Sequence, residues 1–280
     1  ERKPVDFLGK KKIFFIVSII LCLAGPVMMG VNHARGIGAM NYSLDFVGGT
    51  STNVTFDKEY TLEEIDSQMI PSLEEITGDK NIQVQTVKDS NQVVFKTQTL
   101  DLEKREALAS YLNENYGVEA SDIATENISS TVSSEMRRDA VIAVIIATIC
   151  MLLYIWFRFK DIRFATSAVV ALMHDVLVVL GFYVIARVSV GNTFIACMLT
   201  IVGYSINGTI VIFDRIREAL ATKSRTEDLK DLVNRCITQT LTRTIYTNFT
   251  TFVMVVALYI LGVSSIKEFA APLLVGIFCG

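Results

Sequence analysis

The chain has 280 residues, of which 51% are hydrophobic and 20% are charged, and its formal net charge is −3. A mean hydropathy of +0.43 argues against an ordinary soluble globular protein and is typical of a membrane protein. The charged residues gather in two segments, 32–139 and 215–243, while the apolar residues form separate runs. Acidic residues outnumber basic ones about two to one in the first segment, which excludes a phosphate-binding or nucleic-acid-binding surface there.

Several apolar runs are long enough to cross a bilayer, which takes about 20 residues in a helix. A further run starts near Phe269 and stops at Gly280, too short to span, so we expect the sequence to end inside its last helix. The first run is too long for a signal-peptide core and lacks a convincing cleavage site, so we interpret it as a retained anchor. The predicted spans are Ile13–Gly30, Ala140–Phe157, Phe164–Ala186, Thr193–Phe213 and Thr244–Leu261.

Lysine and arginine residues in the short connections predict the orientation of these spans. They cluster before the first span, between the second and third, and between the fourth and fifth, whereas the other short connections carry only Arg187 and Lys267. We therefore expect a multi-pass membrane protein with a cytoplasmic N-terminus. Residues 215–243 are then cytoplasmic as well, and residues 32–139 are extracytoplasmic.

This topology predicts a division into residues 1–31, 32–139 and 140–280. The first part is the cytoplasmic N-terminus with the first span, the second is an outer domain, and the third holds the second to sixth spans. The cytoplasmic residues 217–242 read as a pair of amphipathic helices on the membrane surface.

The outer domain has its own hydrophobic pattern, which predicts a small folded α+β unit. Thr50–Phe56 alternates as a strand, and Thr61 with Glu64 three residues on forms a capping box that opens a helix to about Ile76. The order of all elements is β-α-β-β-α-β, which is ferredoxin-like. The later elements are strands Asn81–Val87 and Gln92–Thr97 joined by a polar turn, a helix Leu102–Tyr116 ended by Gly117, and a strand Ala124–Ser129.

No pattern in the chain predicts a soluble-type enzyme or a metal site. The outer domain has no cysteine, and the only histidines are His33 and His174. The sequence holds no CxxC pair, no P-loop and no GxSxG motif. We therefore expect no catalytic residue, no bound metal and no organic cofactor.

One acidic residue lies near the middle of a predicted span. Asp175 follows His174 directly inside the apolar run Phe164–Ala186. Insertion of a mid-helix aspartate costs about 2.5–3.5 kcal/mol, so such residues usually face a bundle interior and mark an ion or substrate path. The alternative is a buried aspartate that only ties its helix to a neighbour. Successive helical residues point about 100° apart, so His174 need not share the site of Asp175.

Polar residues recur at helical spacing in the fourth and fifth spans. In the predicted topology Asn207 and Asn248 lie in the cytoplasmic half of the bilayer, with Asp175 about one turn further out. This predicts a polar trail from the bilayer centre to the cytoplasm. The alternative for these side chains is interhelical hydrogen bonding worth about 0.6 kcal/mol each. The two sets are Thr200, Gly203, Tyr204, Asn207, Gly208, Asp214 and Arg215, and Thr244, Thr247, Asn248 and Thr251.

Asp214 and Arg215 fall at the cytoplasmic boundary, where charged residues are ordinary, and a structural role is the favoured reading of that pair. Just past the first span, Asp45 with Gly48 and Gly49 is expected to shape the turn into the outer domain.

Four motifs give the chain a resemblance to the SecF family, the small subunit of the bacterial SecDF accessory complex of preprotein translocase. They follow the family order over nearly the whole chain. They are Leu44-Asp-Phe-Val-Gly-Gly-Thr50 after the first span, Ala171-Leu-Met-His-Asp-Val-Leu in the third, Gly203-Tyr-Ser-Ile-Asn-Gly-Thr-Ile-Val-Ile-Phe-Asp-Arg-Ile-Arg-Glu218 in the fourth, and Gln239-Thr-Leu-Thr-Arg-Thr-Ile-Tyr-Thr in the fifth.

The chain departs from the family pattern at one position. Where the family usually reads Asn-Asp in the fourth span, this chain reads Asn207-Gly208. Without this carboxylate, a coupling mechanism that uses two carboxylates is in doubt, and Asp175 becomes the main candidate for ion binding. A glycine there also permits close helix approach.

The resemblance implies a six-helix half-unit similar to those of resistance-nodulation-division transporters, paired with SecD. It implies use of a proton or sodium gradient to draw preproteins outward through the SecYEG channel, after the motor SecA, with YajC and YidC as further candidate partners. The remaining expected partners are membrane lipid and the translocating preprotein. Nucleic acid is not expected to bind. Asp175 would bind and release the ion, supported by His174, Tyr204, Asn207 and the polar face of the fifth span.

Two other readings stay open at this point. The chain could be half of a proton-driven small-molecule exporter of the resistance-nodulation-division superfamily, although that class has a larger outer domain and usually a second half on the same chain. It could also be a non-transporting assembly or sensor subunit, in which Asp175 would be dispensable. The sequence does not decide the coupling ion or whether a SecD partner is fused or separate.

Overall fold

A computed structural model describes residues 5–35, 38–80, 82–86, 91–158, 161–223, 227–262 and 264–280. The chain divides into two compact units. One consists of Glu1–Asn41 together with Ile142–Gly280, and it is helical; the other is Tyr42–Val141, and it contains the sheet. Each unit is described by itself.

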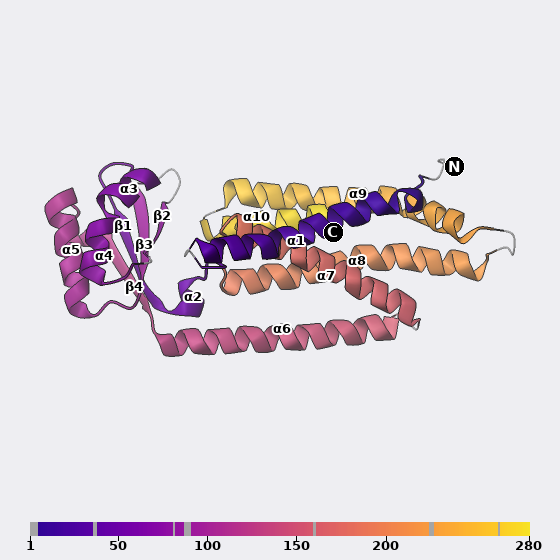
Figure 1. Cartoon of the computed structure of the whole chain (residues 1–280), viewed down its shortest axis with the longest axis horizontal. Helices are drawn as coiled ribbons and strands as arrows, with labels where there is room; N and C mark the ends of the chain where they lie inside the picture. The colour runs from indigo at the N-terminus through magenta and orange to yellow at the C-terminus, as the bar shows by residue number, and fades with distance from the viewer. Residues whose placement is uncertain are drawn as a thin grey trace. The chain divides into compact units, whose positions relative to one another are not determined.

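The helical unit is built from long apolar helices that lie side by side (Figure 1). Helix α7 packs against α1, α8 and α10, and α9 packs against α8 and α10. Among the described residues, five helices are long and apolar enough to cross a membrane. The helices are α1 (Lys11–Ala34), α6 (Ser130–Arg158), α7 (Ile162–Ile185), α8 (Asn192–Ala221), α9 (Leu229–Leu261) and the shorter α10 (Ser264–Cys279).

Helices α1 and α7 approach closely because each presents a glycine at the contact. A Cβ atom added to Gly25 would lie 2.8 Å from the Cα of Gly181. Small residues at such crossings let the two backbones approach, and the contact is then stabilised by van der Waals packing in a bilayer. This contact places α1 along the helix that carries Asp175.

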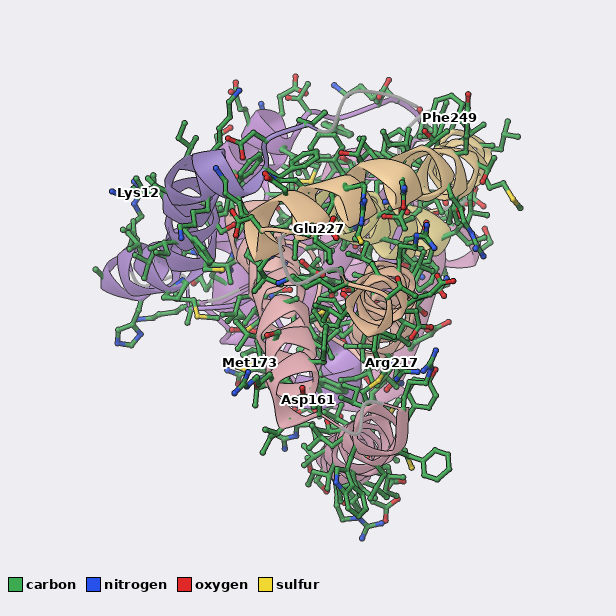
Figure 2. All side chains as sticks on the ribbon, turned by 90° about the vertical axis from the view of Figure 1, so that its right-hand side faces the viewer. Lys12, Asp161, Met173, Arg217, Glu227 and Phe249 are labelled. Atoms are coloured by element: carbon green, nitrogen blue, oxygen red, sulfur yellow. The ribbon has the colours of Figure 1, made fainter. Side chains whose placement is uncertain are left out.

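The outward faces of the helices keep their apolar side chains exposed. Figure 2 shows Met173 of α7 and Phe249 of α9 on the outside of the helices, and these residues are 58% and 62% exposed. Helix α6 has few buried side chains, and its Ile155 packs with Ala168 and Ile206 near its C-terminal end. Exposed apolar surface on this scale is expected of helices whose solvent is lipid.

The second unit is a four-stranded antiparallel sheet in the order β2-β3-β1-β4, with helices between the strands. This is the strand order of a ferredoxin-like unit, so the predicted α+β fold is confirmed. The strands are β1 (Gly49–Thr55), β2 (Gln83–Thr86), β3 (Gln92–Thr97) and β4 (Ile123–Ile128), and the helices are α2 (Leu44–Val47), α3 (Leu62–Gln68), α4 (Ile70–Thr77) and α5 (Leu102–Tyr116).

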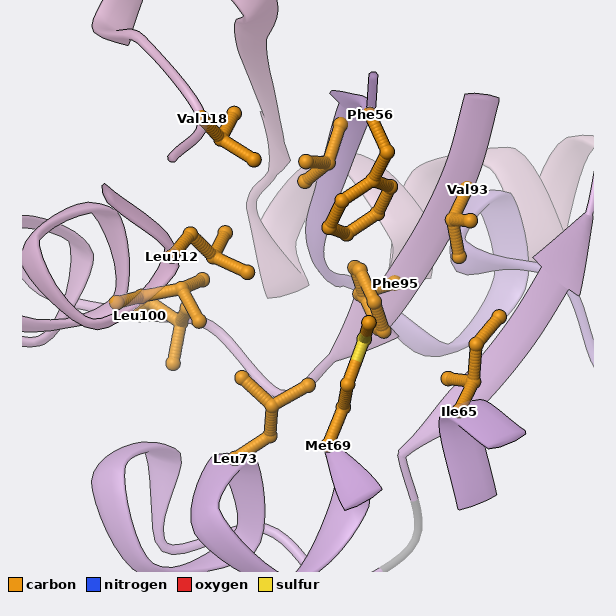
Figure 3. Packing of buried hydrophobic residues seen from close by; sticks show 11 residues of the cluster. Phe56, Ile65, Met69, Leu73, Val93, Phe95, Leu100, Leu112 and Val118 are labelled. Carbon is orange, nitrogen blue, oxygen red and sulfur yellow. The ribbon is translucent and has the colours of Figure 1, made fainter. Parts of the chain in front are cut away.

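One face of the sheet packs against the helices through a continuous apolar core (Figure 3). Phe95 of β3 contributes a fully buried ring, and it is approached by Met69, which joins α3 to α4, and by Leu73 of α4. Local signals set the helix ends: Thr61 and Glu64 form the predicted capping box, and Gly117 ends α5 with a φ of 68°.

The structure corrects two expectations about helices. The predicted helix from Thr61 to Ile76 is interrupted at Met69, because Pro71 stands in the first turn of α4 and cannot supply a backbone N–H to a continuous helix. The expected amphipathic pair over 217–242 does not form helices of its own: the helical residues described there, up to Ala221 and from Leu229, are the end of α8 and the beginning of α9. Ile216, Leu232 and Cys236 form a buried cluster that extends the packing of the two helices past the spans. Of the predicted polar turn Lys88–Asn91, residues 88–90 lie outside the described residues.

Candidate ion-coupling site

Asp175 is buried within the helical unit. It lies on α7 and is 6% exposed, although the helix around it is almost entirely apolar. Its Oδ2 accepts a hydrogen bond from the Ser205 hydroxyl of α8. Gly280, which directly follows α10, lies beside the same oxygen, since a Cβ on Gly280 would be 3.1 Å from it. The carboxylate therefore lies where α7, α8 and the end of α10 meet.

His174 and Asp175 form a pair, although they are neighbours on one helix. The Nδ1 atom of His174 lies 2.8 Å from Oδ1 of Asp175, which is hydrogen-bond distance. The Nε2 atom of His174 is buried and has no hydrogen-bond partner among the described residues. His174 also lines a mostly apolar cavity of about 700 Å³ between α1 and α7. The imidazole thus shares the site of Asp175, which the sequence left open.

A smaller polar cavity of about 100 Å³ lies where the polar faces of α8 and α9 meet. The Tyr204 hydroxyl crosses between the helices and donates to Oδ1 of Asn248 at 2.9 Å. Ser205 lines this cavity and also bonds to Asp175, so it connects the cavity to the buried carboxylate. The lining residues are Tyr204, Ser205, Asn207, Gly208, Val211, Arg243, Thr244, Thr247, Asn248 and Gly280.

Gly208 does not mediate a close helix approach, contrary to the expectation from the sequence. A Cβ atom added there would meet no heavy atom within 4 Å, because the residue faces the polar cavity and not a neighbouring backbone. Gly25 and Gly181, in contrast, bring the backbones of two helices close together. The missing carboxylate at position 208 therefore leaves open space.

Asp214 and Arg215 do not line the cavity, and each makes contacts near the helix ends. Asp214 forms an ion pair with Arg158 of α6. The Arg215 guanidinium contacts Glu218 on its own helix at 2.6 Å and donates to Gln239 of α9 at 2.9 Å. These contacts agree with the structural alternative for the pair.

The motif that follows the first span has a local structural basis in the second unit. Asp45 lies in the first turn of α2, and Gly48 and Gly49 follow with φ values of 79° and 139°. A Cβ on Gly49 would lie 2.3 Å from the carbonyl oxygen of Thr97 on β3. Both positions require glycine, because other residues rarely adopt such positive φ angles.

The sequence did not single out Ser205, whose hydroxyl donates to the Asp175 carboxylate. Its hydroxyl is buried and bonds across to α7 rather than to its own helix. The available signal was its position three residues before Gly208, on the same side of α8. For metals, no group of three His, Cys, Asp or Glu residues that could hold an ion occurs in the described parts of the chain.

The sequence and fold match known proteins over almost the whole chain. The family model for the protein export membrane protein SecD/SecF, C-terminal, matches residues 108–280. Protein translocase subunit SecF of Petrotoga mobilis is 34% identical over 282 aligned residues, covering 99% of this chain and 91% of the relative. SecF of Thermodesulfovibrio yellowstonii is also 34% identical and is covered to 89%.

A solved structure agrees with both units. The crystal structure of SecDF from Thermus thermophilus superposes with a TM-score of 0.81 at 34% identity, over 99% of this chain. This chain spans 36% of that longer protein. A family model over more than half of the chain, SecF relatives over nearly all of it and a matching fold agree with one another, and the chain therefore belongs to the SecD/SecF family of protein export membrane proteins.

Proposed function

We propose that Asp175 is the residue through which this translocase subunit couples an ion gradient to preprotein export. The observation that carries the proposal is a carboxylate 6% exposed inside the membrane-spanning helices, paired with His174 and bonded to Ser205 of the next helix. Acidic residues in such positions are costly, and they mark ion pathways in pumps and transporters. The two hydrogen-bond partners of the carboxylate come from different helices, His174 from α7 and Ser205 from α8. A change in the charge of the carboxylate therefore changes a direct contact with α8.

Binding and release of the ion changes the charge between α7 and α8. A proton on Asp175 removes the negative charge that the Ser205 hydroxyl and the His174 imidazole stabilise. A change of charge at a packed interface biases the helices between two arrangements. The imidazole nitrogen beside the carboxylate favours H+ over Na+, because hard metal cations prefer oxygen ligands.

The polar cavity between α8 and α9 supplies the path to water in this proposal. Ser205 is common to the cavity and the carboxylate, and Asn207, Thr247 and the Tyr204–Asn248 pair continue the polar lining away from it. Water in a cavity needs two to four polar partners, which these side chains offer. The ion would therefore reach Asp175 past Ser205.

The proposed topology and partners follow from the charge pattern and from family membership. Basic connections place the N-terminus and residues 215–243 in the cytoplasm, and residues 32–139 on the outer side of the membrane. The ferredoxin-like unit would then lie where an emerging preprotein can contact it. SecD and the SecYEG channel are the proposed partners, with SecA, YajC and YidC as components of the same machinery.

The test replaces Asp175 by asparagine, which keeps the shape of the side chain and removes its charge. Export of a reporter preprotein is measured in cells that depend on this subunit, and ion-driven export is measured in inverted membrane vesicles. Asp139→Asn is the matched control, because Asp139 is exposed and pairs only with its neighbour Arg138 among the described residues.

Asp175→Asn is expected to abolish the gradient-dependent part of export at normal abundance, and the control is expected to retain it. Normal gradient-dependent export by Asp175→Asn would show that the carboxylate has no coupling role and that a structural tie between α7 and α8 is sufficient. Replacing Na+ by K+ in the vesicle assay separates sodium from proton coupling.

A further inference from the structure

Helices α1 and α7 cross closely and then separate, which leaves a groove between them. The close crossing is at Gly25 and Gly181, and from there the two helices diverge toward their N-terminal ends (Figure 1). The space between them is the mostly apolar cavity of about 700 Å³ that His174 lines, and we call it the α1–α7 groove. It is lined by Phe15, Ser18, Ile19, Cys22 and Leu23 of α1 and by Thr166, Ser167, Val170, Ala171 and His174 of α7.

The hydroxyl groups in the wall of the groove are bonded to their own helix. Thr166 donates to the Ile162 carbonyl at 2.9 Å, and Ser167 donates to the Arg163 carbonyl at 2.8 Å. The groove is open to the surroundings of the helices, since Val170 in its wall is 66% exposed. A ligand that fills the groove therefore meets chiefly hydrocarbon.

Three basic side chains continue the lining faces of both helices by one turn. Lys11 and Lys12 precede Phe15 by four and three residues, and Arg163 precedes Ser167 by four. Residues three and four apart are neighbours on a helix surface, so these cations stand at the N-terminal mouth of the groove. All three are exposed, and none makes an ion pair with another described residue. Figure 2 shows Lys12 on the outside of the helices.

The groove has the depth of one leaflet of a bilayer. The α1 wall from Phe15 to Leu23 is about 12 Å long at about 1.5 Å per residue, and half of a hydrocarbon core of about 30 Å is about 15 Å. The volume of about 700 Å³ holds roughly 20 groups of the size of a water molecule, at about 30 Å³ each, and a methylene group is of similar size. Both dimensions fit the acyl chains of a lipid.

We propose that the α1–α7 groove binds an anionic glycerophospholipid, with its acyl chains along the groove and its phosphate at Lys11, Lys12 and Arg163. The apolar groove and its cationic mouth match the two parts of such a lipid, and each cation near an anionic membrane surface contributes about 1 kcal/mol. In the proposed topology the lipid belongs to the cytoplasmic leaflet. A helix of a partner protein would need a groove across the whole bilayer, but the contact of Gly25 with Gly181 closes this one.

The lipid would lie beside the proposed ion-coupling pair. His174, which lies within hydrogen-bond distance of Asp175, forms the inner end of the groove. An acyl chain there excludes water from the side of the imidazole that faces α1. This consequence rests on the proposed function of Asp175, whereas binding of the lipid does not.

Binding is tested on the purified full-length protein in detergent by measuring the midpoint of thermal unfolding. Phosphatidylglycerol is compared with phosphatidylcholine of the same acyl chains and with free glycerol phosphate, all at constant ionic strength, so that general screening does not change between samples. In parallel, phosphatidylglycerol with a photoreactive acyl chain is irradiated in native membranes, where partner proteins are present, and the labelled peptides are mapped.

Phosphatidylglycerol is expected to raise the midpoint by about 2–4 °C more than phosphatidylcholine does, because a ligand that binds only the folded state stabilises it. Glycerol phosphate is expected to have no effect. The photoreactive lipid is expected to label the peptides of α1 and α7 that line the groove. Asp175→Asn is expected to keep these responses, so failure of the coupling proposal does not affect this test.

Two variants separate the mouth from the groove, and both change exposed side chains, so the fold is expected to persist. Arg163→Gln removes one cation of the mouth and is expected to lose at least half of the phosphatidylglycerol response. Its control is Lys223→Gln, which removes a positive charge from the exposed end of α8. Val170→Trp fills the groove and is expected to lose the response, whereas Val253→Trp, at a 49% exposed valine of α9, is expected to keep it.

The inference is overturned if both phospholipids raise the midpoint equally, since the lipid is then unselective, or if glycerol phosphate alone reproduces the response. It is also overturned if either variant responds like its control, because the mouth or the groove then plays no part. Labelling in native membranes that avoids the peptides of α1 and α7 would show that another protein covers the groove.

Discussion

The Ser205 hydroxyl of α8 donates a hydrogen bond to Oδ2 of the Asp175 carboxylate on α7, and both residues are 6% exposed. This single contact joins a buried charge to the wall of the polar cavity between α8 and α9. A change in the protonation of Asp175 therefore alters its hydrogen bond with Ser205, and this bond links the carboxylate to α8.

Replacement of Ser205 by alanine is expected to weaken gradient-driven export while leaving the chain folded. A hydrogen bond to a charged group contributes about 1.5–3 kcal/mol, and its loss leaves Asp175 with only the His174 contact among the described residues. Export in inverted vesicles is measured at several pH values for Ser205→Ala and Ser205→Cys.

Ser167→Ala is the control for this change, because the Ser167 hydroxyl donates only to the Arg163 carbonyl of its own helix at 2.8 Å. A pH profile of Ser205→Ala identical in shape and height to that of the unaltered chain would show that Ser205 does not influence the carboxylate.

A bulky residue at Gly25 is expected to separate α1 from α7. The Cβ of any larger residue would lie 2.8 Å from the Cα of Gly181, so Gly25→Leu forces the backbones apart. Overpacking of this kind typically costs about 1–3 kcal/mol. Thermal unfolding of the purified chain in detergent measures the loss.

Gly30→Leu is the matched comparison on the same helix, because a Cβ at Gly30 would meet no heavy atom within 4 Å. Equal midpoints for Gly25→Leu and Gly30→Leu would show that the α1–α7 contact is not close in the membrane protein.

Alanine at Gly49 is expected to destabilise the ferredoxin-like unit more than alanine at Gly117. Both residues have positive φ, which costs other residues about 1–2 kcal/mol, but only Gly49 adds a clash, at 2.3 Å from the Thr97 carbonyl oxygen. Hydrogen exchange of the strand amides in the intact chain reports the difference. Equal protection factors in the two variants would show that the clash with Thr97 does not destabilise the ferredoxin-like unit.

The N-terminal segment is held to α9 by a hydrogen-bonded asparagine, which predicts a pH dependence. Oδ1 of Asn234 accepts from the backbone amides of Phe7 and Leu8, each at 3.1 Å, and its Nδ2 donates to Asp6 at 3.0 Å. The Gly9 backbone amide, with further help from Asn234 and Lys230, holds the pKa of the Asp6 carboxyl below its ordinary value of 3.8.

A lowered pKa in the folded state means that ionised Asp6 stabilises the fold above its ordinary pKa, and that this contribution is lost as the pH falls through the lowered value. The unaltered chain is therefore expected to unfold at a higher temperature than Asp6→Asn at pH 7. The difference is expected to vanish well below pH 3.8. A difference that is the same at both pH values would mean that the charge of Asp6 plays no part.

Local signals predicted the elements whose ends are set by neighbouring residues. Helix α5 and strand β3 have the predicted bounds, Leu102–Tyr116 and Gln92–Thr97, because a left-handed glycine ends the helix and alternation marks the strand. The apolar pattern continues through Met69 and does not show the break there; Pro71, in the first turn of α4, is the local signal of it.

The membrane spans and the anomalous Asp175 were determined by the sequence alone, since a buried charge in an apolar run is costly wherever it lies. What the carboxylate contacts was decided only by the tertiary structure. A serine inside a helix usually bonds to its own backbone, so nothing local says that Ser205 reaches across to Asp175. In the same way, Gly25 and Gly208 are indistinguishable by type, and only packing makes one a helix contact and the other the wall of a cavity.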